Sequence, residues 1–205
     1  EDNKFDHTKV ALSIGVQLMV RSDLACSGVN FTLDPDTGFD KVILISSTWG
    51  LGENIVQGSI NPDEYFVFKP SLEKGTLQPI ISRKLGSKEK TMIYDSSGTG
   101  TINLDTELEK QEQFVLTDSE VIKLAKWSLV IETHYGRPMD IEWAKDGHTN
   151  ELFIVQARPE TVQNAKKDNL KITTSTLLEK GEEITRGIGL GNKITSGKAR
   201  ILLSP

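Results

Sequence analysis

The sequence predicts an α+β domain built mainly on antiparallel strands. Three observations support this prediction: short apolar runs recur between turn residues, one well-capped helical segment follows them, and two alternating runs after residue 138 have the pattern of a hairpin. Hydrophobic residues make up 37% of the 205 residues and charged residues 26%, which is enough apolar material for a packed core. This composition excludes a chain that is disordered throughout.

Charge, cysteine content and hydropathy exclude several classes of protein. The formal net charge is −5 and no run of five like charges occurs, so we expect no nucleic-acid partner. The single cysteine, Cys26, excludes a disulfide framework, and its apolar neighbours predict a buried side chain rather than a nucleophile. No apolar run is long enough to span a membrane, and residues 1–4 do not form a secretory signal. We therefore expect a cytoplasmic protein without a membrane-bound part.

The composition divides the chain into three expected parts. Residues 1–162 carry the globular pattern, whereas residues 163–186 are rich in Lys, Glu, Thr and Asn, which is typical of a linker with one exposed strand at most. Residues 187–205 resemble the start of a second, β-rich domain. The chain does not begin with methionine and both ends look cut, so we expect a segment of a longer protein.

The expected strands follow one another through the first hundred residues. Residues 10–20 carry no charge and alternate loosely, which predicts a buried strand. Residues 27–33 alternate and lead into a strong turn signal at residues 34–38. The continuous apolar run at residues 42–46 is typical of a central strand. Further short strands are expected at residues 65–68, 80–81 and 92–94, with a loop at 96–100.

One helix is expected from Thr117 onward. Thr117 and Glu120 have the spacing of a capping box, in which each side chain accepts a hydrogen bond from the other residue's backbone N–H. Gly136 is suited to a left-handed helix end, and Pro138 prevents continuation. The apolar positions form a wide stripe for burial: Val121, Leu124, Ala125, Leu129 and Ile131.

Residues 139–144 and 152–158 alternate between apolar and polar side chains, and Asp146-Gly147 supplies a turn between them. We expect an antiparallel hairpin. If Glu142 pairs with Gln156, the same register places Asp140 opposite Arg158, with all four polar side chains on one face. The other face is then expected to carry Met139, Trp143, Phe153 and Val155.

The polar face of this hairpin has two possible meanings. Glu142 and Gln156 offer oxygen ligands of the kind that Mg²⁺ prefers and commonly shares with phosphate, while Arg158 offers a planar fork for phosphate oxygens. Alternatively, Asp140 and Arg158 form a cross-strand ion pair on a solvated sheet face. Spacing alone favours the ion pair, because such pairs are common.

Other candidate sites give weaker signals. The glycines of residues 49–53 suit either an anion-binding loop or a tight turn, and the turn is the better interpretation. The backbone of residues 17–20 is suited to pairing with an adenine edge, although core packing explains this stretch equally well. The histidines lack metal-ligand spacing and are expected at the surface or at helix ends: His7, His134 and His148. A group of basic residues is expected in a solvated loop: Arg83, Lys84, Lys88 and Lys90.

The amino-acid identities in several segments point to a family more specifically than these patterns do. Between residues 10 and 161 the chain resembles the nucleotide-binding domain of the phosphoenolpyruvate synthase family, which belongs to the ATP-grasp class and is shared with pyruvate phosphate dikinase. The segments that carry the resemblance are residues 16–23 (VQLMVRSD), 27–32 (SGVNFT), 49–58 (WGLGENIVQG), 61–65 (NPDEY), 134–143 (HYGRPMDIEW) and 153–161 (FIVQARPET).

This resemblance implies a fold and a set of site residues. The implied fold is an ATP-grasp-like subdomain, with a mixed or antiparallel sheet and flanking helices, truncated at its N-terminal lobe. By position, Glu142 and Gln156 correspond to Mg²⁺ ligands and Arg158 to a contact with the terminal phosphates of ATP. The residues expected to meet adenine are Gln17, Met19 and Val20.

The resemblance also implies an activity and partners. The parent enzyme would convert ATP, pyruvate and water to AMP, phosphoenolpyruvate and phosphate through a phosphohistidine. The implied partners are ATP and three parts of the same parent chain: the N-terminal lobe, the swivelling histidine domain and the pyruvate-binding barrel. The family's Thr-Cys-His acceptor motif is absent from this sequence, so the phospho-acceptor lies outside it and the chain alone is expected to be inactive. The alternatives are a related dikinase, an antibiotic phosphotransferase on the same scaffold, and a non-catalytic interaction module.

Overall fold

A computed structural model describes residues 11, 14–75, 77–161, 179, 181–182 and 196–198. The expected linker at 163–186 and the expected second domain at 187–205 lie almost entirely outside the described residues, so these boundaries stay predictions. In the described part of the chain, none of the helices has the length and apolar character needed to span a membrane.

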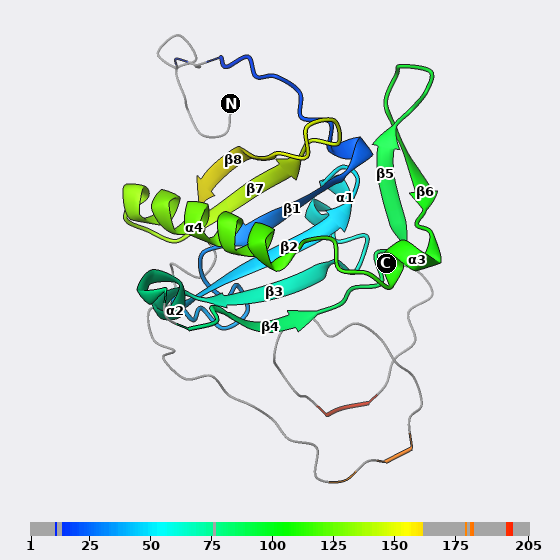
Figure 1. Cartoon of the computed structure of the whole chain (residues 1–205). Coiled ribbons are helices and arrows are strands. Elements are labelled where there is room, and N and C mark those ends of the chain that lie inside the picture. The colour runs from blue at the N-terminus through cyan, green and yellow to red at the C-terminus, as the bar shows by residue number, and fades with distance from the viewer. Residues whose placement is uncertain are drawn as a thin grey trace, which may run out of the picture.

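The centre of the fold is one six-stranded antiparallel sheet with the order β4-β3-β2-β1-β7-β8 (Figure 1). Every neighbouring pair of strands in it is antiparallel, which confirms the predicted α+β class. The apolar run at residues 42–46 lies inside the sheet, as predicted. The strands are β1 (Cys26–Phe31), β2 (Val42–Trp49), β3 (Asp63–Phe68), β4 (Ile80–Lys84), β7 (Met139–Lys145) and β8 (Leu152–Pro159).

Helix α4 (Asp118–Tyr135) covers one face of this sheet. Its capping box between Thr117 and Glu120 is present, and Gly136 ends it in the left-handed conformation with φ 64°, so both predicted ends are confirmed. On the helix, Val121, Leu124 and Ala125 are fully buried. They pack in one cluster with the facing side chains of the sheet: Cys26, Ile43, Ile45, Tyr65, Val67 and Trp143.

The smaller elements lie around the edges of the sheet. A separate hairpin of β5 (Lys90–Tyr94) and β6 (Thr101–Asp105) stands beside the end of β2. It is joined there by a hydrogen bond from the Leu51 N–H to the Met92 carbonyl, 2.9 Å. The short helices are η2 (Ser22–Leu24), α1 (Glu53–Val56), α2 (Lys69–Lys74) and α3 (Leu108–Gln111).

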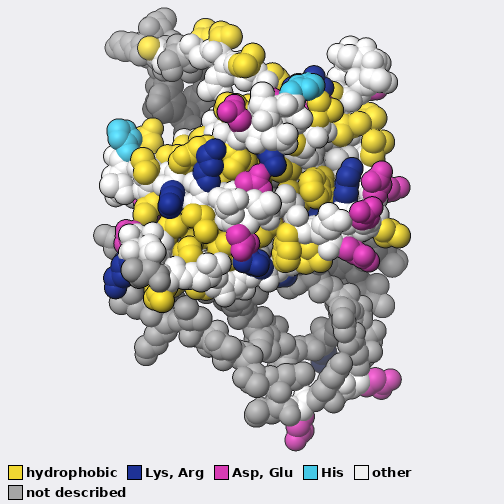
Figure 2. All heavy atoms as spheres, in the orientation of Figure 1, with side chains coloured by type: hydrophobic (Ala, Val, Ile, Leu, Met, Phe, Trp, Pro, Cys, Tyr) yellow, Lys and Arg dark blue, Asp and Glu magenta, His cyan; other side chains and the backbone are white. Residues whose placement is uncertain are grey.

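The surface over α4 carries charges of both signs. Figure 2 shows Lys and Arg side chains interspersed with Asp and Glu across this face rather than gathered in one basic patch. Several of these charges pair between elements, for example Lys145 with Glu120 at 2.7 Å and Lys69 with Glu132 at 2.6 Å.

The strand expected at residues 10–20 is absent from the described residues 11 and 14–20. Residues 14–20 run along the molecule without regular structure, and Val16 and Leu18 are 96% and 95% exposed. A strand needs a neighbour that supplies hydrogen-bond partners for its backbone, and no described strand pairs with this segment. The segment is therefore largely exposed in this structure, although most of its residues are apolar.

The predicted face assignment of the hairpin is wrong for Phe153 and Val155. A bulge between Glu142 and Trp143 shifts the register, so that Trp143 pairs with Ile154 and Ala144 with Phe153. One extra residue on β8 exchanges the faces beyond it, because side chains alternate every residue. Ile154 consequently packs against the core, while Phe153 is 39% exposed on the opposite face.

The prediction of a solvated basic loop is wrong for Lys88. Its side chain is completely buried, and its ammonium lies 2.6 Å from the buried carboxylate of Asp63. The other basic residues of this group are exposed, as predicted, but they lie on strands rather than in a loop: Arg83 and Lys84 on β4 and Lys90 on β5. They form surface ion pairs: Arg83 with Asp118, Lys84 with Glu64 and Lys90 with Asp105.

Candidate functional site

The polar residues of the β7–β8 hairpin lie on the sheet face opposite α4. Glu142 pairs with Gln156 on β8 and with Val29 on β1, and Asp140 pairs with Arg158. The predicted register is therefore confirmed at both pairs. The bulge lies beyond Glu142, toward the hairpin turn, so it leaves these two pairs in place. The four polar side chains share one face, as expected from alternation.

Asp140 and Arg158 form the cross-strand ion pair that spacing favoured. Arg158 Nε lies 2.8 Å and Nη2 2.7 Å from Asp140 Oδ2. Asp140 is nearly buried, whereas the Arg158 side chain is 61% exposed. The hydrogen bond and charge of Asp140, together with the nearby charge of Glu142, raise the pKa of the Arg158 guanidinium, so it stays protonated.

Glu142 and Gln156 have no such partner. Within the described part of the chain, neither side chain forms a hydrogen bond or an ion pair, so their oxygens are available. A carboxylate and an amide carbonyl are hard ligands that fit Mg²⁺. The described residues contain no group of three or more His, Cys, Asp or Glu side chains that could hold a metal ion. A cation here would therefore need further oxygen ligands from water or from a bound anion.

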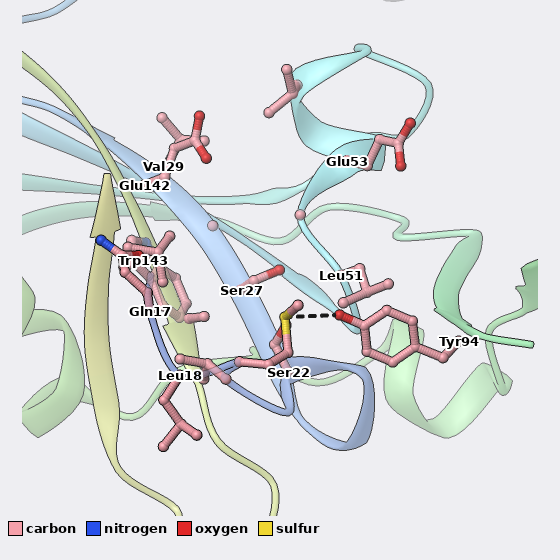
Figure 3. Close-up of a pocket in the computed structure, with 17 residues that line it drawn as sticks. Gln17, Leu18, Ser22, Ser27, Val29, Leu51, Glu53, Tyr94, Glu142 and Trp143 are labelled. Carbon is pink, nitrogen blue, oxygen red and sulfur yellow. Dashed lines mark hydrogen bonds between the residues drawn. The ribbon is translucent and has the colours of Figure 1, made fainter. Parts of the chain in front are cut away.

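A cavity of about 510 Å³ opens beside Glu142 (Figure 3). The N-terminal segment with Gln17, Met19 and Val20 forms one wall, although these residues are more than 120 positions from Glu142. Four of the six residues expected to bind ligand thus meet in one cavity. Gln156 and Arg158 do not line it, but they lie on the same sheet face next to Glu142 and Asp140.

The lining of the cavity is mostly apolar and has no basic side chain. Glu142 and Glu53 supply its charged groups, and the described lining residues include no Lys or Arg. The remaining walls are formed by apolar, aromatic and small residues, among them Leu18, Val29, Leu51, Val56, Tyr94 and Val155. Such a cavity suits a neutral, largely apolar group.

The glycine-containing residues 49–53 form a tight turn at the edge of this cavity. Gly50 has φ 77°, and its N–H donates to the Ala25 carbonyl at 3.0 Å. The next N–H, that of Leu51, donates to Met92. Two N–H groups of the loop are therefore already used, which favours the turn interpretation, and Gly52 and Glu53 line the cavity.

The end of the N-terminal wall is held by the β7–β8 turn. Asp146 Oδ2 accepts a hydrogen bond from the Arg21 N–H at 3.0 Å, and the Gly147 N–H donates to the Arg21 carbonyl at 3.0 Å. The Arg21 side chain pairs with Asp23 through two hydrogen bonds of 2.8 and 2.9 Å. These contacts connect the wall to the strand that carries Glu142.

Comparison with known proteins identifies the family of this chain. The family model described as "Pyruvate phosphate dikinase, AMP/ATP-binding domain" matches residues 1–177. The chain belongs to this family. It is 51% identical to the phosphoenolpyruvate synthase of Synechocystis over 98% of this chain and 25% of that protein. The proteins of the same name from Aquifex aeolicus and Escherichia coli are 50% and 49% identical over 97% of the chain.

These matches confirm the resemblance that the sequence motifs indicated. The chain spans about a quarter of the length of the curated relatives it matches. The residues that match the AMP/ATP-binding domain family include both the cavity and the hairpin.

Some residues of this AMP/ATP-binding domain were not expected in the site. Tyr94 lines the cavity although it belongs to none of the motifs, and Leu51 and Val155 line it although their motifs gave them no role in binding. Val155 reaches it through the bulge, and Tyr94 through the placement of the β5–β6 hairpin, neither of which has a local sequence signal. Two other expectations hold: His134 and His148 are exposed, and Cys26 is buried, which raises the pKa of its thiol to about 12. His7 lies outside the described residues.

Proposed function

We propose that the chain is the ATP- and Mg²⁺-binding part of a phosphoenolpyruvate synthase and that its fold is the larger ATP-grasp subdomain. One observation carries the proposal: Gln17, Met19 and Val20 line the same cavity as Glu142, far from them in sequence. The apolar, non-basic cavity suits adenosine. The hairpin face next to it offers the oxygen ligands and the guanidinium that a triphosphate requires.

In this proposal each residue has a separate task. The backbone of residues 17–20 meets the adenine edge, and the cavity encloses the nucleoside. Glu142 and Gln156 hold Mg²⁺, which neutralises phosphate charge when it is bound. Arg158 binds the terminal phosphates with the donors that Asp140 does not use. Positioning and charge neutralisation of this kind supply most of the catalysis in phosphoryl transfer.

The complete enzyme would convert ATP, pyruvate and water to AMP, phosphoenolpyruvate and phosphate in the cytoplasm. A histidine on a swivelling domain, a pyruvate-binding barrel and an N-terminal ATP-grasp lobe would belong to the same parent chain. Residues 163–186 would link to the swivelling domain, whose first strand would begin within 187–205. The names of the relatives support this reaction over that of a related dikinase or an antibiotic phosphotransferase. Family membership also favours it over a non-catalytic module.

Calorimetric titration of the chain with Mg-ATP tests the site. We expect weak, metal-dependent binding, since ATP in an ATP-grasp enzyme lies between two lobes. Glu142→Gln and Arg158→Ala should each raise the Kd by about tenfold or more, because charge-assisted contacts are lost. Matched controls are Glu151→Gln in the exposed hairpin turn and Arg83→Ala, which pairs with Asp118 away from the cavity.

Two results would contradict the proposal. Unchanged affinity in both Glu142→Gln and Arg158→Ala would overturn the site assignment. Formation of AMP and phosphoenolpyruvate by the purified 205-residue chain would show that the chain is sufficient for turnover, contrary to the expectation that the acceptor histidine lies elsewhere.

A further inference from the structure

Tyr94 joins the β5–β6 hairpin to the N-terminal wall of the cavity. Its hydroxyl donates a hydrogen bond to Met19 Sδ at 3.2 Å (Figure 3). The Arg21 guanidinium lies over its ring, 5.9 Å from the centroid. One side chain from β5 therefore contacts two residues of a segment that is more than 70 positions away in sequence.

This contact matters because the wall has little other support. Residues 14–20 are not paired with any described strand, and Leu18 beside Met19 is 95% exposed. Asp146 and Gly147 fix the segment only at Arg21. Nearer the cavity, Met19 is held through its own side chain, whose sulfur accepts a hydrogen bond from the Tyr94 hydroxyl.

Tyr94 is itself firmly placed. It pairs with Thr101 at the end of the β5–β6 ladder. Two residues earlier, Met92 is 6% exposed and forms a parallel bridge with Gly50. The Met92 carbonyl also accepts the Leu51 N–H. Strand β5 is thus anchored to the end of β2, so Tyr94 supports the wall from the main body of the domain.

We propose that Tyr94 is a positioning residue of the nucleotide site: it holds Met19 and Arg21 so that the wall of residues 17–20 faces the nucleobase. This inference rests on the proposed function. It assigns Tyr94 to the nucleoside end of the ligand, because Tyr94 lines the cavity whereas Arg158 and Gln156 lie outside it. Loss of Tyr94 should therefore weaken binding of ATP without weakening binding of a triphosphate that lacks a nucleoside.

The test compares Mg-ATP with Mg-tripolyphosphate on the 205-residue chain. A thioether is a weak acceptor and the cation–π contact is partly exposed, so we expect Tyr94→Leu to raise the Kd for Mg-ATP by about threefold to tenfold. The Kd for Mg-tripolyphosphate should stay the same. Tyr94→Phe keeps the ring and should recover part of the loss. Tyr135→Leu, at the exposed end of α4, is the control and should change neither Kd.

A double-mutant cycle tests whether Tyr94 acts through Met19. Tyr94→Leu and Met19→Leu should be non-additive, with the double variant little weaker for Mg-ATP than the worse single variant. Additive losses would overturn the positioning role. Equal weakening of Mg-ATP and Mg-tripolyphosphate would overturn it as well, because that result indicates a general structural effect.

A measurement without nucleotide separates this inference from the proposed function. The chain has three methionines, so ¹³C-methyl labelling gives three signals, and Met19→Leu assigns one of them. Tyr94→Leu should shift the Met19 methyl signal through the lost ring, while the fully buried Met139 stays unchanged. An unshifted Met19 signal would overturn the contact itself. If the unmodified chain binds tripolyphosphate but not ATP, the nucleoside end of the proposal fails while the phosphate face stands.

Discussion

Asp140 and Arg158 face each other across β7 and β8, and both guanidinium contacts end on the same carboxylate oxygen, Oδ2, at 2.7 and 2.8 Å. These contacts use Nε and Nη2, and a guanidinium carries five N–H donors in all. Here Arg158 keeps other N–H donors, and its side chain is 61% exposed. The ion pair and a phosphate contact are therefore compatible, since Asp140 orients a cation that can still bind an anion.

Asp140→Asn should change the free energy of unfolding by less than about 1 kcal/mol. The reason is that one partner is largely solvated, which places the pair among surface ion pairs despite the low exposure of Asp140. Urea unfolding measures the change. Asp118→Asn, which breaks the exposed pair with Arg83, is the matched control. A loss of about 3 kcal/mol or more would mean that the pair behaves as a buried one.

Gly28→Ala should destabilise the sheet by about 3 kcal/mol or more. A Cβ at Gly28 would lie 1.9 Å from the Ser46 carbonyl oxygen and 2.6 Å from Trp143 Cζ2. The first is backbone of a neighbouring strand and the second is a fully buried ring, so neither can move aside. Urea unfolding compares this variant with Gly15→Ala, where nothing lies within 4 Å. Similar stability of the two variants would contradict the prediction.

Acid should loosen the attachment between the N-terminal wall and the hairpin turn. The backbone N–H of Arg21, followed by those of Thr149 and His148, lowers the pKa of Asp146 below its ordinary 3.8. A lowered folded-state pKa contributes stability above 3.8 that is lost as the pH falls through the lowered value. The stability difference between the unmodified chain and Asp146→Asn, measured by urea unfolding between about pH 2.5 and 5.5, should therefore shrink toward acid. A difference that is constant over this range would contradict the prediction.

Local patterns predicted the parts of the structure that depend on neighbouring residues. Alternation with period two and the Asp146-Gly147 turn gave the pairing of Glu142 with Gln156, and the spacing of Thr117 and Glu120 gave the start of α4. Each of these features is decided within about twenty residues. The bulge that exposes Phe153 was not predicted, because an extra residue in a ladder leaves the apolar-polar alternation almost unchanged.

Long-range contacts account for the other differences. The apolar residues 14–20 have the composition of a buried strand, but composition does not show whether a neighbouring strand is present. Tyr94 reaches Met19 only because β5 docks at the end of β2, which no spacing in the sequence indicates. The motifs therefore identified the residues of the hairpin face, whereas the cavity beside it required the structure.

Lys88→Met should be among the most destabilising substitutions, with a loss of about 3–5 kcal/mol. Lys88 and Asp63 are completely buried, and the ammonium donates to Asp63 Oδ1 at 2.6 Å and to the carbonyls of Gly86 and Gln111. Methionine keeps a long, unbranched side chain but leaves the Asp63 carboxylate buried without its cation.

The Asp63 carboxylate also accepts hydrogen bonds from the N–H groups of Gly86 and Val115, and these bonds fix two loops to β3. Adding Asp63→Asn to Lys88→Met should therefore recover part of the loss, since it removes the unpaired charge and keeps an acceptor oxygen for one of these two N–H groups. Lys84→Met, which breaks the exposed pair with Glu64, is the control and should cost less than about 1 kcal/mol in urea unfolding. If Lys88→Met and Lys84→Met lose similar stability, the buried pair does not hold the loops to the sheet.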